Sequence, residues 1–318
     1  MPLFTSKCAG AVAPRRRISP WTEEERSSWL PPDHRIKADG ICVFNILGKW
    51  QSMRSRFVFG CILILVASIT PPAQAQEDVA DVPAEDLRVG DDPQQRYFLI
   101  GADDGKAAPE EGIGLLLVLP GGDGSAEFHS FVKRIYKNAV PEGYLMAQLV
   151  APQWSPGQRI TWPTAKSKVP QQKMTTEEFI EAVIKDVASK QKLNRDRIYT
   201  LSWSSGGPAA YAASLSSPSI RGSFVAMSVF NPKHLPSLKQ ASGRAYYIYH
   251  SPEDRVCPFR MAQQAANDLK QNGGKTELAT YEGGHGWRGN VYGNIRTGFN
   301  WLETNSSAAP ATDSKPVR

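Results

Sequence analysis

The chain has 318 residues, a formal net charge of +6 and four cysteines. Its excess of basic residues lies before residue 76, so the remainder is close to neutral and lacks the clustered basic face that nucleic-acid binding needs. Cys8, Cys42 and Cys61 also precede residue 76, which leaves only Cys257 and excludes a disulfide within residues 76–318.

Residues 53–75 have the three parts of a secretory signal peptide in the expected order. A short basic start at Met53 precedes the apolar run Phe57 to Ile69, and a small-x-small pattern ends at Ala75. We therefore expect cleavage after Ala75, export to the periplasm or the extracellular medium, and no stable membrane insertion afterwards. An uncleaved membrane tether is the alternative. Residues 1–52 show no sustained period and are interpreted as a non-native extension or disordered, with translation starting at Met53.

Signals for regular structure begin near residue 93. Residues 76–92 are acidic and contain proline, which predicts a linker, and residues 305–318 form a polar tail predicted to be disordered. Between them, residues 93–304 alternate strand and helix patterns. Strands are expected at 97–100, 114–119, 144–150, 198–201, 222–227, 245–250 and 276–281, and helices at 127–139, 175–191, 209–213, 258–270 and 294–302. This alternation predicts an α/β fold with a mostly parallel central sheet and helices on both faces. Such sheets place their active sites at the carboxyl ends of the strands.

A tight turn joins the predicted strand 198–201 to the helix that follows. A serine at the tip of such a turn needs small residues two positions before and after it, as in the pattern G-x-S-x-G. Ser204 meets this requirement with Ser202 and Gly206, whereas Ser205 would place Trp203 at a position without room for an indole. Ser204 is therefore the predicted nucleophile. The alternative is an ordinary Ser/Gly-rich loop.

Two later loops carry the groups that could activate this serine. A serine hydroxyl needs a nearby base, and the base needs a group that orients it. His285 follows the last predicted strand and has glycines on both sides, which leave its ring room to approach the serine. Asp254 follows the preceding strand, at the same edge of the sheet, and is the predicted orienting acid. Glu253 is the alternative acid, and His250 is interpreted as a buried residue or a loop support.

A glycine-rich loop follows the predicted strand 114–119. Its backbone can supply one N–H donor to an oxyanion, and we favour Gly122; Ser205, directly after the nucleophile, can supply the second donor. The alternative, a phosphate cradle, lacks the glycine spacing of known phosphate loops, and Asp123 would repel a phosphate. The sequence contains no metal-ligand cluster of Cys and His, and no metal or other cofactor is expected.

These elements resemble the α/β-hydrolase superfamily over about Arg96 to Leu302, in the order serine, aspartate, histidine. The chain looks similar to secreted serine esterases near the phospholipase/carboxylesterase and polyhydroxyalkanoate-depolymerase/feruloyl-esterase groups. The resemblance rests on Leu119-Pro120-Gly121-Gly122, on Ser204-Ser205-Gly206-Gly207, on Asp254 with Val256 and Pro258, and on Gly284-His285-Gly286-Trp287. Two residues depart from it, Pro120 in place of a histidine and Ser202 in place of the first turn glycine. The resemblance implies hydrolysis of carboxylic esters through an acyl-enzyme.

The expected partner is an ester, either a small molecule or one carried on a polymer. Only a short connection separates the strands 222–227 and 245–250, where many lipases insert a lid, so we expect no large lid domain. Trp203, Trp287 and Trp162 are predicted to contact the acyl or aryl group, with ordinary packing as the alternative. A peptidase on the same fold and a catalytically silent binding module are the competing functions.

Overall fold

The computed structural model describes residues 78–102 and 109–306. The predicted extension 1–52 and the predicted signal peptide 53–75 lie outside these residues. The elements in chain order are β1 (Ala84–Arg88), η1 (Val89–Asp91), η2 (Pro93–Gln95), β2 (Arg96–Ile100), β3 (Ile113–Leu119), η3 (Ala126–Phe128), α3 (His129–Ala139), β4 (Tyr144–Leu149), α4 (Thr176–Lys190), β5 (Leu193–Trp203), η4 (Ser204–Gly206), α5 (Gly207–Ser216), β6 (Gly222–Ala226), η5 (Pro232–His234), η6 (Leu238–Ala241), β7 (Ala245–His250), α6 (Phe259–Gln271), β8 (Lys275–Thr280) and α7 (Val291–Asn305). Here η denotes a short 3₁₀ helix.

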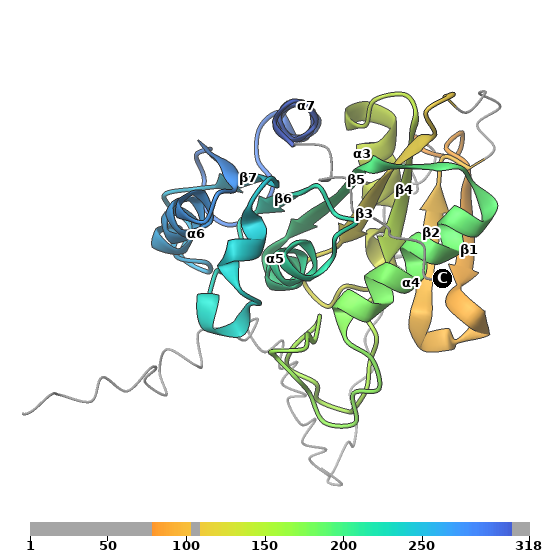
Figure 1. Cartoon of the computed structure of the whole chain (residues 1–318), viewed down its shortest axis with the longest axis horizontal. Helices are drawn as coiled ribbons and strands as arrows, with labels where there is room; N and C mark the ends of the chain where they lie inside the picture. Colours follow the sequence, from red (N-terminus) through yellow and green to blue (C-terminus); the bar gives the residue numbers. More distant parts are fainter. Residues whose placement is uncertain (1–77, 103–108, 307–318) are drawn as a thin grey trace, which may run out of the picture. The chain divides into compact units, whose positions relative to one another are not determined.

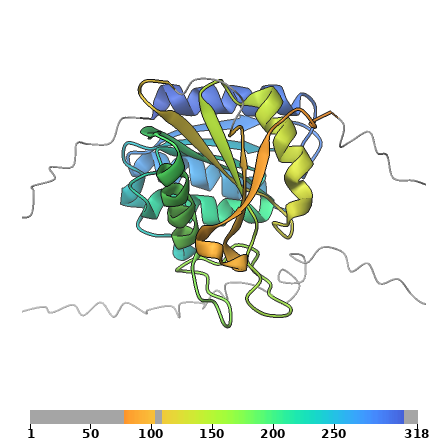
Figure 2. The same ribbon diagram turned by 90° about the vertical axis from the view of Figure 1, so that its right-hand side faces the viewer.

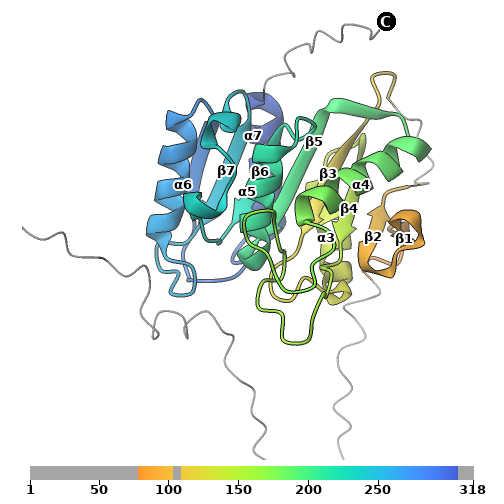
Figure 3. The same cartoon turned by 60° about the horizontal axis from the view of Figure 1, so that its bottom comes forward.

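The strands form one eight-stranded sheet in the order β1-β2-β4-β3-β5-β6-β7-β8 (Figure 3). Strands β1 and β2 pair antiparallel, as do β2 and β4, and the other five pairs are parallel. The predicted mostly parallel sheet is thus confirmed. Because β3, β5, β6, β7 and β8 run in the same direction, the loops that follow them meet at one edge of the sheet.

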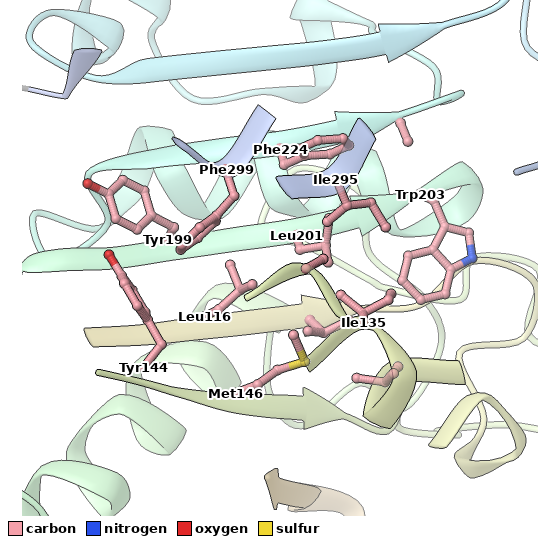
Figure 4. Packing of buried hydrophobic residues seen from close by; sticks show 14 of the residues in the cluster. Leu116, Ile135, Tyr144, Met146, Tyr199, Leu201, Trp203, Phe224, Ile295 and Phe299 are labelled. Carbon is pink, nitrogen blue, oxygen red and sulfur yellow. The ribbon is translucent and has the colours of Figure 1, made fainter. Parts of the chain in front are cut away.

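Two hydrophobic clusters cover the two faces of the sheet, because side chains alternate along each strand. In β3, Leu116 and Val118 belong to the cluster that includes residues of α3 and α7, whereas Leu115, Leu117 and Leu119 belong to the cluster that includes residues of α4 and α5. Helices α3 and α7 cover one face of the sheet, and α4 and α5 cover the other (Figure 1). Figure 4 shows the first cluster, in which Ile135 of α3 and Phe299 of α7 pack on Leu116 and Leu201. Both faces are therefore covered by helices, as the alternating pattern predicts.

The expected linker is part of the folded domain. Residues 78–92 include the edge strand β1, and Val79 and Val82 are buried in the cluster beneath α3. Strand β1 has a polar sequence because it lies at the edge of the sheet with most of its side chains exposed. The predicted tail also begins too early, since α7 continues to Asn305 and the hydroxyls of Tyr199 and Ser306 form a 2.7 Å hydrogen bond.

Only the short helices η5 and η6 lie in the connection between β6 and β7, so the described residues contain no large lid domain. A longer irregular segment, residues 151–174, projects beyond the sheet between β4 and α4 (Figure 2, light green). None of the helices in residues 78–102 and 109–306 is long and apolar enough to cross a membrane.

Candidate active site

Strand β5 presents Ser204 at a sharp turn into helix α5. Ser204 has a φ of 49°, in the left-handed region that residues other than glycine rarely adopt. The two glycines that follow Ser205 are needed because neighbouring atoms leave no room for a Cβ. A Cβ at Gly206 would lie 2.2 Å from the Leu119 carbonyl oxygen, and one at Gly207 would lie 2.1 Å from the Ser228 hydroxyl. The turn thus needs both glycines.

A second serine supports this strained turn. The buried Ser228 lies just after β6, and its hydroxyl donates a 2.6 Å hydrogen bond to the backbone carbonyl of Ser204. Ser202, which replaces the usual first glycine, is fully buried and donates a 3.3 Å hydrogen bond to the Phe224 carbonyl. The hydroxyl at position 202 is therefore buried with a hydrogen-bond partner.

The carboxylate of Asp254 is buried directly after β7. Its Oδ1 accepts hydrogen bonds from the backbone N–H groups of Val256 and Cys257, both at 2.8 Å. Burial by itself would raise the pKa of this carboxyl, but hydrogen bonds from His250, His285 and the Cys257 N–H outweigh burial and lower it. Asp254 is therefore an anion at neutral pH.

His285 connects Asp254 to Ser204. Its Nδ1 lies 2.8 Å from Asp254 Oδ2, and its Nε2 lies 3.1 Å from Ser204 Oγ. Because an ionised carboxylate can only accept, Nδ1 carries the proton and Nε2 is free to accept one from the serine hydroxyl. The structure thus brings the three predicted side chains into one hydrogen-bonded chain.

Glu253, the alternative acid, takes a different position. Its Oε2 accepts a 3.0 Å hydrogen bond from the N–H of Gly283, on the loop that carries His285. Ser251 supports the same loop by accepting a 3.2 Å hydrogen bond from the N–H of Gly284. Glu253 therefore steadies the histidine loop while Asp254 contacts the imidazole.

The glycine-rich loop after β3 lies against the serine turn. A Cβ at Gly121 would come 3.0 Å from Ser204 Cβ, so this position has room only for hydrogen. The carbonyl of Gly122 accepts hydrogen bonds from the hydroxyls of Ser205, at 2.7 Å, and Thr161, at 2.9 Å. The Gly121 carbonyl accepts from the N–H of Gly124, while the N–H of Gly122 makes no hydrogen bond to another described residue. That N–H remains available to a ligand.

The three predicted substrate-contact tryptophans differ in their accessibility. Trp162 is 2% exposed and donates from Nε1 to the Pro120 carbonyl at 2.9 Å, so it supports the glycine-rich loop. Trp203 is 5% exposed and packs edge-on against Phe128 and Trp287. In this structure both fit the packing alternative. Trp287 is half-buried and keeps some accessible surface.

Two apolar side chains on loops of the site are more accessible than the sequence predicts. Val256 is 51% exposed, and Ile160 is 38% exposed; they are the exposed large hydrophobics among the described residues. Val256 lies two residues after Asp254, and Ile160 precedes Thr161, which contacts the glycine-rich loop. Their positions beside the two loops are visible in the sequence, but their exposure depends on the fold.

One group of potential metal ligands overlaps the site. Ligand atoms of Asp254, Cys257 and His285 lie within 4.8 Å of one another. Burial and the charge of Asp254 raise the pKa of the Cys257 thiol to about 12, so it is protonated at neutral pH and is a poor metal ligand. The side chains of His285 and Asp254 are already hydrogen-bonded to each other. The arrangement favours proton transfer over metal binding.

The sheet topology together with a serine turn, an acid loop and a histidine loop at one edge defines an α/β-hydrolase fold. A model of the phospholipase/carboxylesterase family matches residues 135–297, half of the chain and the part that contains Ser204, Asp254 and His285. The chain belongs to this family, and it is a carboxylic ester hydrolase.

Solved structures show the same fold. A thermostable esterase from Pseudomonas putida superimposes with a TM-score of 0.53 at 12% identity, over 74% of this chain and 88% of that one. A thermostable carboxylesterase cloned from a metagenomic library gives 0.52 at 14% identity, over 74% and 96%. A structure described in a study of two esterases from Rhizomucor miehei gives 0.54 at 12% identity, over 75% and 87%. No curated protein sequence matches the chain.

Proposed function

We propose that the protein hydrolyses carboxylic esters through an acyl-enzyme formed on Ser204. The observation that carries this proposal is the unbroken hydrogen-bonded chain from Asp254 through His285 to the Ser204 hydroxyl. Each distance lies within the range of a formed hydrogen bond, so proton transfer needs no large rearrangement. Membership of an esterase family supports the same chemistry.

In the proposed first half-reaction, Ser204 Oγ attacks the ester carbonyl carbon while its proton passes to His285 Nε2. The carbonyl π electrons move to oxygen, and the N–H groups of Gly122 and Ser205 stabilise the resulting oxyanion, each contributing about 3 kcal/mol to the barrier reduction. When the oxyanion collapses, the bond to the alcohol oxygen breaks and His285 returns the proton to the leaving alcohol. Ser204 is left acylated.

In the second half-reaction, a water molecule replaces the alcohol. His285 Nε2 removes a proton from that water as its oxygen attacks the acyl carbon, and the same oxyanion contacts apply. Collapse releases the carboxylic acid, and the proton on His285 returns to Ser204 Oγ. Throughout both steps the Asp254 carboxylate keeps Nδ1 protonated and stabilises the imidazolium.

The proposed substrate is a small-molecule or polymer-borne ester whose apolar part contacts the rim of the site. The lack of a large lid domain in the described residues favours an open site. Val256, Ile160 and Trp287 supply accessible apolar surface beside the acid, glycine-rich and histidine loops. No nucleic-acid partner is proposed.

Covalent labelling with a fluorophosphonate tests this function. The reagent phosphonylates a serine only when the hydroxyl is activated, so the wild type should be labelled and peptide mapping should locate the adduct at Ser204. The His285→Ala variant should react at least a hundredfold more slowly. An adduct elsewhere, or equal labelling of both proteins, would reject the assignment.

We also propose that the protein is exported by residues 53–75 and that the mature chain begins at Gln76. This proposal rests on the charged, apolar and small-residue segments of that stretch. Expression of the full chain followed by cell fractionation and N-terminal sequencing tests it. A product that keeps residues 53–75 and remains with the membranes would favour the tether instead.

A further inference from the structure

A second histidine contacts the Asp254 carboxylate. His250 is the last residue of β7, four positions before Asp254, and it is 1% exposed. Its Nε2 lies 3.3 Å from Asp254 Oδ2 and 2.8 Å from the backbone carbonyl oxygen of Cys257. The proposed reaction assigns no role to this side chain, although it approaches the oxygen that His285 contacts.

The Cys257 carbonyl determines which His250 nitrogen carries a proton. A carbonyl oxygen can only accept, so Nε2 must be the donor in the 2.8 Å hydrogen bond. The same nitrogen lies 3.3 Å from Asp254 Oδ2, which is also an acceptor. His250 can therefore direct this N–H toward the carboxylate without needing a positive charge.

With His250 included, four N–H donors surround the carboxylate. Oδ1 accepts from the backbone of Val256 and Cys257, and Oδ2 accepts from His285 Nδ1 and lies 3.3 Å from His250 Nε2. The two backbone donors hold Oδ1, and His250 approaches Oδ2 from β7, so rotation of the carboxylate would disturb several of these contacts at once.

The position of His250 in the fold makes it a rigid support. Its backbone belongs to β7, which is paired on both sides by β6 and β8, and its ring packs edge-on against Phe259 of α6. His285, by contrast, lies on a loop flanked by glycines. His250 therefore approaches the acid from the sheet, whereas His285 approaches it from a loop.

We propose that His250 is a positioning residue whose Nε2–H holds the Asp254 carboxylate in the orientation that aligns His285 with Ser204. This inference rests on the proposed acyl-enzyme reaction, because the alignment matters only if His285 is the base. The alternative role for His250 is support of the loop after β7 alone. For that role the hydrogen bond to the Cys257 carbonyl would suffice, and the short distance to Asp254 Oδ2 would have no effect on catalysis.

Two replacements of His250 separate these roles. His250→Gln keeps an amide N–H near the position of Nε2, whereas His250→Phe keeps a ring against Phe259 and removes the donor. Turnover of p-nitrophenyl butyrate should be measured on the full chain and divided by the active sites titrated with a fluorophosphonate. His234→Gln, at an exposed histidine of η5, is the control for loss of an imidazole elsewhere.

We expect kcat per titrated site to fall between tenfold and a hundredfold in His250→Phe, with KM changed less than threefold, because misalignment affects the transition state more than substrate binding. His250→Gln should recover at least half of that loss on a logarithmic scale. Equal kcat values for the two variants, or a Phe variant as active as the wild type, would overturn the proposal.

A spectroscopic measurement keeps the proposal testable if His250→Phe fails to fold. In wild-type protein labelled with ¹⁵N-histidine, His250 should be protonated at Nε2, and the His285 Nδ1 proton should shift in His250→Gln. A His250 ring protonated only at Nδ1 would contradict the inference. Lack of esterase turnover in the wild type would instead reject the proposed function, and the same spectrum would still test the contact with Asp254.

Discussion

Replacement of Asp254 by asparagine gives the sharpest prediction about the site. The side chain keeps its shape, and its amide oxygen can still accept from the Val256 and Cys257 N–H groups. Its amide NH₂, however, replaces Oδ2 and faces two N–H donors, His285 Nδ1 and His250 Nε2. A donor cannot pair with a donor, so His285 must change tautomer and place its proton on Nε2.

The consequence for catalysis follows from the 3.1 Å contact between His285 Nε2 and Ser204 Oγ. A protonated Nε2 cannot accept the serine proton, and the imidazolium also loses its anionic partner. We expect kcat for p-nitrophenyl butyrate to fall by on the order of 10⁴-fold, or about 5.5 kcal/mol of barrier. KM should change little, since Asp254 is buried and does not line the rim.

Glu253→Gln is the matched control. Its amide oxygen can keep the hydrogen bond to the Gly283 N–H, so we expect kcat within about threefold of the wild type. Both variants should be compared at equal folded concentration, judged by circular dichroism. A kcat for Asp254→Asn within tenfold of the wild type, or a larger loss in Glu253→Gln, would refute the assignment of Asp254.

The packing around the site yields three further predictions. Gly206→Ala should lower the free energy of unfolding by about 1–3 kcal/mol, because its Cβ would lie 2.2 Å from the Leu119 carbonyl oxygen, and chemical denaturation measures the loss. A variant as stable as the wild type would contradict this explanation. The Cys257 thiol is 4% exposed and has a pKa raised to about 12, so iodoacetamide at pH 8 should alkylate it only after unfolding, as peptide mass spectrometry can show. Rapid alkylation in the native protein would be inconsistent with the buried thiol. Val256→Asn should reduce kcat/KM for p-nitrophenyl butyrate relative to acetate by about threefold, because it removes apolar surface at the rim; an unchanged ratio would exclude Val256 as an acyl contact.

The sequence predicts the fold well where hydrophobic runs are long and buried. The apolar run of β3 and the periodic helix α4 with its Thr175 and Glu178 capping box lie where the patterns place them. The edge strand β1 has the sequence character of a linker because it pairs on one side only and exposes most of its side chains. A polar edge strand has little hydrophobic periodicity to detect.

The site residues also differ in how far the sequence predicts their positions. Ser204, Asp254 and His285 follow strands whose carboxyl ends share an edge, so topology alone brings their loops together. The burial of Trp162 and Trp203 depends on which carbonyl and which rings lie nearby, and no local pattern encodes those neighbours. The contact between His250 and Asp254 likewise requires the turn after β7 to fold back on the strand.

Pre-steady-state kinetics of p-nitrophenyl acetate and butyrate, with Ser204→Ala as the reference, test the acyl-enzyme on Ser204 most directly. A burst of p-nitrophenol equal to the enzyme concentration, followed by slower turnover, is the expected result for an acyl-enzyme on Ser204 with rate-limiting deacylation, and it should disappear in Ser204→Ala. Absence of both burst and turnover in the folded wild type, or a burst of equal size in the variant, would contradict the proposed mechanism.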